Sequence, residues 1–198
     1  MSAFLCVAMC RSILAKAATV LLVLAVTASG GAAQTAVGST RSMILSGPAF
    51  DAALLAEVNQ VRARHGLRPF AADTRLTGAA QRHAGDMAHT RRMEHEIAGR
   101  PSFSARIRAS GARIRTAGEN ILRSDLSRYG AGCSAAAAAP VQALKAVLAR
   151  DSVQRWMGSP KHRESILNPR FQRMGSGFAV VSAPDGCGQI YVAQVFGG

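Results

Sequence analysis

The sequence predicts an α+β fold in which helices pack against an antiparallel sheet. Helical spacing of apolar residues dominates the first two thirds of the chain, and two apolar, β-branched segments follow at residues 174–181 and 189–196. The loop between them, residues 182–188, contains the turn signal Asp185-Gly186, so we expect an antiparallel hairpin. Helices that come first and strands that come last are typical of helices covering one sheet.

Five helices are predicted before the hairpin from apolar spacing and from capping residues. The stretch before the second helix, residues 67–70, should be extended because proline disfavours helix before it. A strand is expected at residues 117–122, and the alanine-rich residues 123–140 are interpreted as an inserted loop. The predicted helices cover residues 50–66, residues 73–90 with Asp73 or Thr74 as cap, residues 102–111, residues 141–157, and a short helix that Ser159 caps and Pro160 begins.

The N-terminal segment is typical of a secretory signal peptide. Its aliphatic run at residues 18–28 follows two basic residues and precedes small residues up to Ala33, after which we expect cleavage. This run is too short for a helix that crosses about 30 Å of hydrocarbon, so no stable membrane anchor is expected. We predict a secreted product, periplasmic or released, with a flexible lead-in at residues 34–47 and one domain at residues 48–198.

Two cysteines remain after this cleavage, Cys133 and Cys187. An exported protein meets oxidising conditions, so we expect one disulfide, either within one chain or between two chains. Within one chain it would close a loop of 54 positions. In the chain-entropy model this loop closure contributes about 4 kcal/mol to stability.

The chain is strongly basic, with a formal net charge of +13 at pH 7. Loss of Arg11 and Lys16 with the leader would leave 22 basic and 11 acidic residues, a balance of +11. Such a surface should attract polyanions: acidic envelope lipids, anionic polysaccharide or nucleic acid. All but three of the basic residues are arginine, so the coding bias of a genome is an equally good explanation, and both stay open. No basic stretch alternates with aromatic residues, which argues against specific nucleic-acid binding.

Three residues are candidates for a metal site. His162 falls in the first turn of the short helix, where the positive helix end should keep its imidazole neutral. His95 lies in a polar segment, and Glu119 begins an apolar strand that disfavours an acid. Two imidazoles and one carboxylate suit a divalent cation such as zinc, although separations of 24 and 43 residues do not enforce a site. The alternative for His162 is a partly buried imidazole satisfied by a backbone carbonyl.

Four pieces of sequence carry a resemblance to a known family. They are LLAEVNQVRARHGL (54–67) with LTGAAQRHAGDMA (76–88), AGENI (117–121), WMGSPKHRESILNPRFQRMGSGFAVV (156–181) and YVAQVFG (191–197). In this order they resemble bacterial members of the CAP superfamily, which includes cysteine-rich secretory proteins, venom antigens five and plant pathogenesis-related proteins, and whose domain is also called SCP. The resemblance covers about 150 residues and fails chiefly over the alanine-rich insert. It implies a three-layer α-β-α sandwich with a central antiparallel sheet.

The resemblance also implies a cleft with two histidines and two acids. His95 resembles the first histidine, Glu119 the first acid and His162 the second histidine. The nearest match to the second acid is Ser159, which is a poor metal ligand. Asn120 could orient neighbouring loops through its amide.

The remaining candidates are interpreted as structural. His83 lies on the apolar stripe of the second helix, where we expect a hydrogen-bonded packing role. His65 is interpreted as a helix-end residue, His89 as solvated and Trp156 as a plug of the core.

Together with the residues above, the resemblance implies a fold and leaves three candidate functions. The leading one is a secreted binding module whose cleft takes zinc or another divalent cation, with lipid or sterol binding in a separate groove. The second is a metal-assisted hydrolase or peptidase with Glu119 as base, which the missing second acid disfavours, so we lean away from an enzyme. The third is a basic protein that interacts with the envelope without cleft chemistry. The sequence predicts no oligomeric state.

Overall fold

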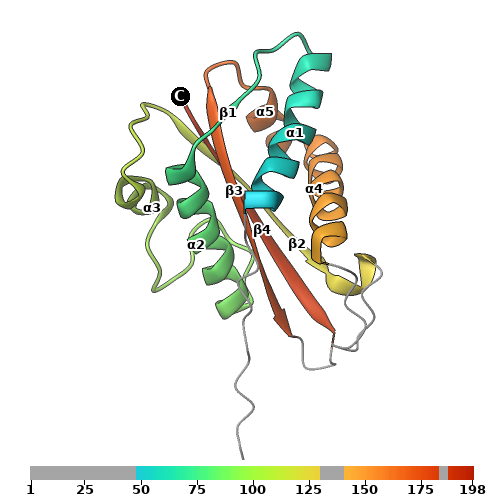
Figure 1. The fold of residues 1–198 in the computed structure, drawn as a ribbon. Coiled ribbons are helices and arrows are strands. Elements are labelled where there is room, and N and C mark those ends of the chain that lie inside the picture. The colour runs from blue at the N-terminus through green and yellow to red at the C-terminus, as the bar shows by residue number, and fades with distance from the viewer. Residues whose placement is uncertain (1–47, 130–140, 183–186) are drawn as a thin grey trace, which may run out of the picture. The chain divides into compact units, whose positions relative to one another are not determined.

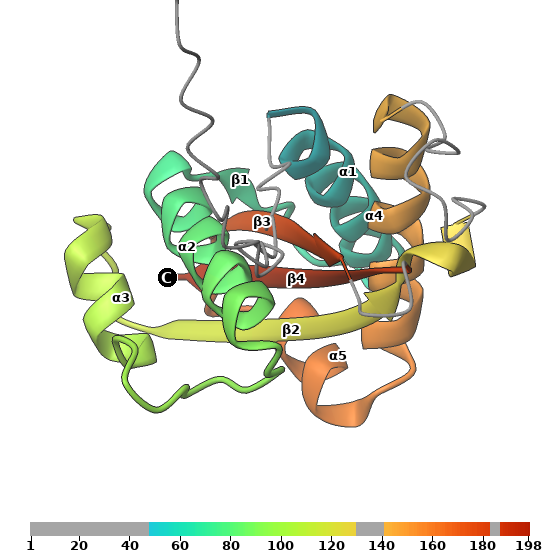
Figure 2. The same cartoon turned by 90° about the horizontal axis from the view of Figure 1, so that it is seen from below.

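The computed structural model of the chain describes residues 48–129, 141–182 and 187–198. These residues form three layers, as the sequence predicts (Figure 1 and Figure 2). On one face of the sheet lie α2 (Thr74–Thr90) and α3 (Phe103–Ser110). On the other face lie α1 (Pro48–Arg64), α4 (Val141–Met157) and α5 (Pro160–Leu167). The predicted signal peptide, the lead-in and Cys133 lie outside the described residues, so the pairing of Cys133 with Cys187 stays a prediction.

The sheet has the strand order β1-β3-β4-β2. Strands β3 (Arg173–Ser182) and β4 (Gly188–Gly197) form the predicted antiparallel hairpin, and β2 (Ala117–Asp125) pairs antiparallel with β4. The two-residue strand β1 (Ala71–Ala72) runs parallel to β3, so the sheet is mixed rather than wholly antiparallel. This exception is small, because β1 is only the short extended link between α1 and α2.

Both faces of the sheet are buried, because side chains of a strand alternate between its two faces. Strand β4 illustrates this: Ile190 and Val192 belong to the core beneath α1, α4 and α5, whereas Tyr191 and Ala193 belong to the core beneath α2 and α3. The continuous apolar runs of the last third of the sequence therefore follow from burial on two sides.

Helix α2 packs directly on β3 through two glycines of that strand. A Cβ atom at Gly175 would lie 2.0 Å from the backbone nitrogen of Thr77, and one at Gly177 would lie 2.6 Å from the Cα atom of Gln81. Both separations are far shorter than a van der Waals contact. The absence of side chains at these two positions thus lets α2 lie against the sheet.

The predicted cap of α2 is confirmed: the Asp73 carboxylate accepts hydrogen bonds from the backbone of Arg75 and Leu76. Helix α3 has a cap that was not predicted, because the Ser102 hydroxyl accepts a hydrogen bond from Ala105. Ser159 occupies the predicted N-cap position of α5, but its side chain makes no capping hydrogen bond, so that expectation is wrong. Its backbone carbonyl still accepts from the amide of Arg163 at 2.8 Å.

The predicted start of the inserted loop, residue 123, is wrong. Residues 123–125 extend β2 and pair with residues 189–191 of β4, and a 3-10 helix, η1 (Leu126–Tyr129), follows. Leu126 and Tyr129 pack against the core, which explains why this polar-looking segment joins the fold. Residues 130–140 lie outside the described part of the chain.

Candidate functional site

The centre of the candidate site is Glu119, on β2. Its side chain is 3% exposed, and it faces Arg106 of α3, whose side chain is 4% exposed. The Nη2 atom of Arg106 donates to Oε1 of Glu119 at 2.9 Å and to Oε2 at 3.1 Å. A buried carboxylate is tolerated when it is paired and hydrogen-bonded, and Arg106 supplies both conditions.

His95 makes the second contact with this carboxylate. Its Nδ1 atom lies 2.9 Å from Oε2 of Glu119, while half of the His95 side chain is exposed. A carboxylate that faces a guanidinium can only accept hydrogen bonds, so we assign the proton of His95 to Nδ1. In the neutral form of His95, the Nε2 atom then keeps its lone pair.

Arg106 also holds the segment that carries His95. Its guanidinium donates to the carbonyl oxygens of Pro101, at 2.9 Å, and of His95, at 3.1 Å. The sequence interpretation missed this residue. A signal was present, because Arg106 lies three residues after Phe103 and one before Ile107, on the helix face predicted to point inward.

His83 lies on the other side of the same carboxylate. It is 1% exposed, and its Nε2 atom lies 3.5 Å from Oε2 of Glu119. Burial lowers the pKa of His83; the charge of Arg106 acts in the same direction, and Glu119 and Asp86 oppose it. The predicted packing position is confirmed. Neither ring nitrogen meets strict hydrogen-bond geometry within the described residues, but a hydrogen bond with the backbone of Glu94 opposes the lowering of the pKa of His83, so the hydrogen-bonded role expected from sequence stays a prediction.

His162 lies in the first turn of α5 and is half-buried. Burial lowers its pKa, and the charge of His95 lowers it further, so the imidazole is neutral at pH 7, as predicted. Burial and the neighbouring His95 both act in this direction. An influence of His95 on this pKa also means that the two rings lie close enough for their charges to interact.

Asn120 fixes the backbone beneath His162. It is fully buried, and its Nδ2 atom donates to the carbonyl of His162 at 3.2 Å and to Oε1 of Gln194 at 3.3 Å. The predicted orienting role of the amide therefore agrees with these contacts. The side chain of Ser159, by contrast, makes no hydrogen bond with His95, Glu119 or His162.

The structure therefore brings the predicted residues together only in part. His95 and Glu119 are in contact, and His162 is a near neighbour that makes no ring hydrogen bond with either in the described structure. Over residues 48–129, 141–182 and 187–198, no group of three or more His, Cys, Asp or Glu side chains could hold a metal ion. Both oxygens of Glu119 already accept hydrogen bonds, Oε1 from Arg106 and Oε2 from Arg106 and His95. Glu119 is therefore better placed to hold His95 than to bind a metal ion directly, and the imidazoles of His95 and His162 remain as candidate ligands.

The other residues follow the structural interpretation. His65 follows the last turn of α1, and both His65 and His89 are exposed. Trp156 is fully buried, and its indole nitrogen donates to the carbonyl of Ile121 at 3.1 Å. In the described part of the chain, no helix is long and apolar enough to span a membrane.

A protein-family model now decides the family. The model of the cysteine-rich secretory protein family, CAP, matches residues 55–196. The chain belongs to the CAP family. The match includes β2 with Glu119, the loop with His95 and the α5 helix with His162.

Individual CAP relatives agree with this assignment. An uncharacterized protein of Bacillus subtilis, YkwD, is 27% identical over 140 residues, which cover 71% of this chain and 46% of that protein. The chain therefore spans about half the length of this curated relative.

Two solved structures share the CAP fold with this chain. An extracellular protein of Bacillus anthracis that contains an SCP domain has a TM-score of 0.53 and 22% identity, and the match covers 75% of this chain and 40% of that protein. An outer surface protein of Borrelia burgdorferi has a TM-score of 0.55 and 16% identity, and the match covers 80% of this chain and 98% of that protein. At these identities the likeness shows the fold alone.

Proposed function

We propose that this CAP domain is an exported binding module that takes a divalent cation such as zinc between His95 and His162. In this proposal Glu119 orients His95 and is not itself a ligand. The observation that carries it is the 2.9 Å contact between Nδ1 of His95 and Oε2 of Glu119, made while Arg106 neutralises the same carboxylate. In many metal sites, a carboxylate accepts a hydrogen bond from the ring nitrogen of a histidine whose other nitrogen binds the metal.

The properties of the two imidazoles support this role. His95 exposes half of its side chain and keeps the Nε2 lone pair, while the lowered pKa of His162 leaves that ring neutral. Neutral imidazole is the form that binds metal. Two protein nitrogens would leave the remaining positions of a four-coordinate ion to water or to a bound molecule, so we expect modest affinity and an open site.

The hydrolase alternative gains no support from the geometry. A general base must reach the proton that it removes, but the Glu119 side chain is 3% exposed and both its oxygens already accept hydrogen bonds. Binding is therefore a better proposal than hydrolysis for this site.

Export is supported by two independent observations. The apolar run at residues 18–28 is typical of a signal peptide. The similar Bacillus anthracis protein is described as extracellular, and the Borrelia burgdorferi protein as an outer surface protein.

Zinc titration by isothermal calorimetry tests the proposal. The protein should bind zinc saturably at one site, and the double variant His95→Ala/His162→Ala should lose this binding. His65→Ala and His89→Ala, which remove exposed histidines elsewhere, should bind as the parent does. Glu119→Gln should weaken binding by about 10- to 100-fold without abolishing it, because the carboxylate only orients a ligand. Unchanged affinity in the double histidine variant would rule the site out.

A further inference from the structure

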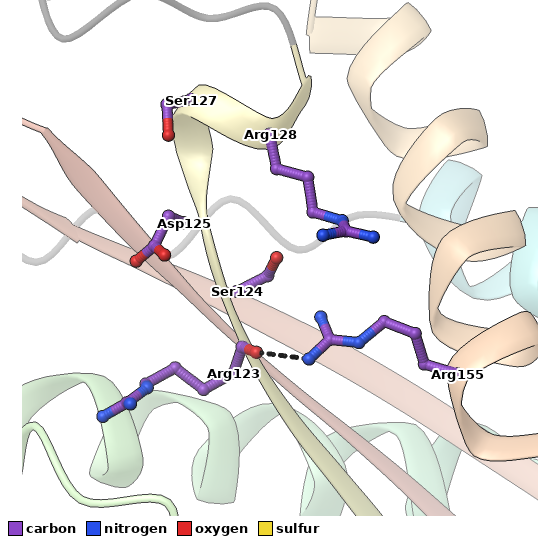
Figure 3. Close-up of a pocket in the computed structure, with 6 residues that line it drawn as sticks. All are labelled: Arg123, Ser124, Asp125, Ser127, Arg128 and Arg155. Atoms are coloured by element: carbon purple, nitrogen blue, oxygen red, sulfur yellow. Dashed lines mark hydrogen bonds between the residues drawn. The ribbon is translucent and has the colours of Figure 1, made fainter. Parts of the chain in front are cut away.

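A pocket lies at the far end of β2 from Glu119, between η1 and α4. It has a volume of about 460 Å³ and is lined by polar and charged residues (Figure 3). None of these described residues makes a hydrogen bond or an ion pair with Glu119, so this pocket is separate from the site around His95 and Glu119. The lining residues are Arg123, Ser124, Asp125, Ser127, Arg128 and Arg155.

Two guanidiniums meet in this pocket from different elements. Figure 3 shows Arg128 of η1 and Arg155 of α4 on the same side of β2, whereas Arg123 and Asp125 point to its other side. The alternation of side chains along a strand produces this division. On the side of β2 that faces η1 and α4, the positive charge that a ligand would meet therefore comes from Arg128 and Arg155.

Asp151 lies beside both guanidiniums and holds them as a pair. Its Oδ1 atom is 3.5 Å from Nε of Arg128, and its Oδ2 atom is 3.7 Å from Nη1 of Arg155. The hydroxyl of Tyr129 donates to Oδ2 at 2.7 Å. Burial raises the pKa of Tyr129, so the hydroxyl keeps its proton and remains a donor. Asp151 thus accepts a short hydrogen bond from Tyr129 and forms longer ion pairs with both arginines.

Most guanidinium donors of this pair are left for a ligand. Each guanidinium has five N–H donors. In the described residues, their one hydrogen bond runs from Nη2 of Arg155 to the carbonyl of Arg123, at 3.1 Å. That bond fixes Arg155 in place, which reduces the ordering cost when a ligand binds. The net charge of Arg128, Arg155 and Asp151 together is +1.

We propose that this pocket binds a phosphate group, held by Arg128 and Arg155 in a fork. A guanidinium presents several donors in a planar fork that matches the oxygens of phosphate. The phosphate could be carried by a lipid headgroup or by a sugar phosphate, and the test below distinguishes these sources.

The test uses the full chain and inorganic phosphate as the probe. Side-chain Nε–Hε signals of Arg128 and Arg155 should shift saturably as phosphate is added in NMR, and this measurement on the parent protein needs no variant. The double variant Arg128→Gln/Arg155→Gln should lose about tenfold or more in phosphate affinity, because charge-assisted hydrogen bonds are removed. Arg75→Gln is the control, since Arg75 is exposed on α2, on the opposite face of the sheet.

Vesicles that contain phosphatidylglycerol distinguish the sources of the phosphate. Reduced vesicle binding in the double variant would identify a headgroup, and unchanged vesicle binding with lost phosphate binding would identify a soluble or sugar-linked phosphate; both results support the pocket. Absence of a saturable shift at the two arginines overturns the proposal. So does a loss of phosphate affinity in Arg75→Gln equal to that in the double variant, because the attraction would then be general rather than local.

Discussion

Replacement of Arg106 by methionine should destabilise the protein strongly. The substitution removes the guanidinium that donates to both oxygens of Glu119 and to the carbonyl of His95. The side chains of Arg106 and Glu119 are 4% and 3% exposed, so water cannot replace the lost partner without opening the structure. Glu119 would be left as a buried carboxylate without its compensating charge.

The expected cost follows from this burial. Removing one partner of a buried ion pair costs about 3–5 kcal/mol, out of a typical domain stability of about 5–15 kcal/mol. For a domain of this size, 1 kcal/mol corresponds to a shift of about 2–4 °C in Tm. We therefore expect Tm to fall by roughly 6–20 °C.

Urea denaturation followed by circular dichroism measures this cost, with calorimetry for Tm. The control is Arg108→Met, two residues further along α3, where the arginine is exposed; its effect should stay within about 0.5 kcal/mol. The double variant Arg106→Met/Glu119→Gln should recover part of the loss, because it leaves no buried charge. Equal stability of the two single arginine variants, or simple additivity in the double variant, would refute the buried pair as an element of stability.

Two further predictions concern pH and packing. The folded-state pKa values of His83 and His162 are lowered, so the unfolded chain binds protons more readily below about pH 6.5. The free energy of unfolding should therefore fall as pH decreases from about 7.5 to 5.5. Urea denaturation in the presence of EDTA should show a smaller fall for the double variant His83→Gln/His162→Gln. Identical slopes of unfolding free energy against pH in the parent and the variant would contradict this. Gly177→Ala should lower the free energy of unfolding by about 1–3 kcal/mol, because its Cβ atom would lie 2.6 Å from the Cα atom of Gln81. Gly78→Ala is the control: its Cβ atom would meet its nearest neighbour at 3.5 Å, so this variant should be neutral or more stable by up to about 1 kcal/mol. Thermal melts of the two glycine variants check this, and a Gly177→Ala protein as stable as Gly78→Ala would contradict the close packing of α2 on β3.

Much of the fold could be predicted because its signals are local. Asp73 and Ser102 each cap the helix that they precede, and Gly66 and Gly111 have positive φ where α1 and α3 end. Capping and left-handed turns depend on a few neighbouring residues, which a single sequence contains. The parallel pairing of β1 could not be read in this way, because it involves only two residues and a partner strand about a hundred positions away.

The candidate site was predictable only as far as its residues belong to sequence motifs. His95, Glu119 and His162 were nominated from their residue types and positions and then matched to a cleft through the family resemblance, whereas Arg106 and His83 were missed as members of the network. The pairing of Arg106 with Glu119 arises where α3 packs beside β2, and no spacing in the sequence encodes that approach. Because Arg106 pairs with Glu119, the role that we assign to Glu119 is to orient His95, whereas the sequence predicted a metal ligand.

A crystal structure of the protein soaked with zinc, with the metal located by anomalous diffraction, tests the central proposal most directly. The account predicts one zinc ion with imidazole nitrogens of His95 and His162 at about 2.0–2.1 Å. Glu119 should still contact Arg106 and His95 in that complex. A zinc ion coordinated by the Glu119 carboxylate, or one that binds away from both imidazoles, would contradict the account.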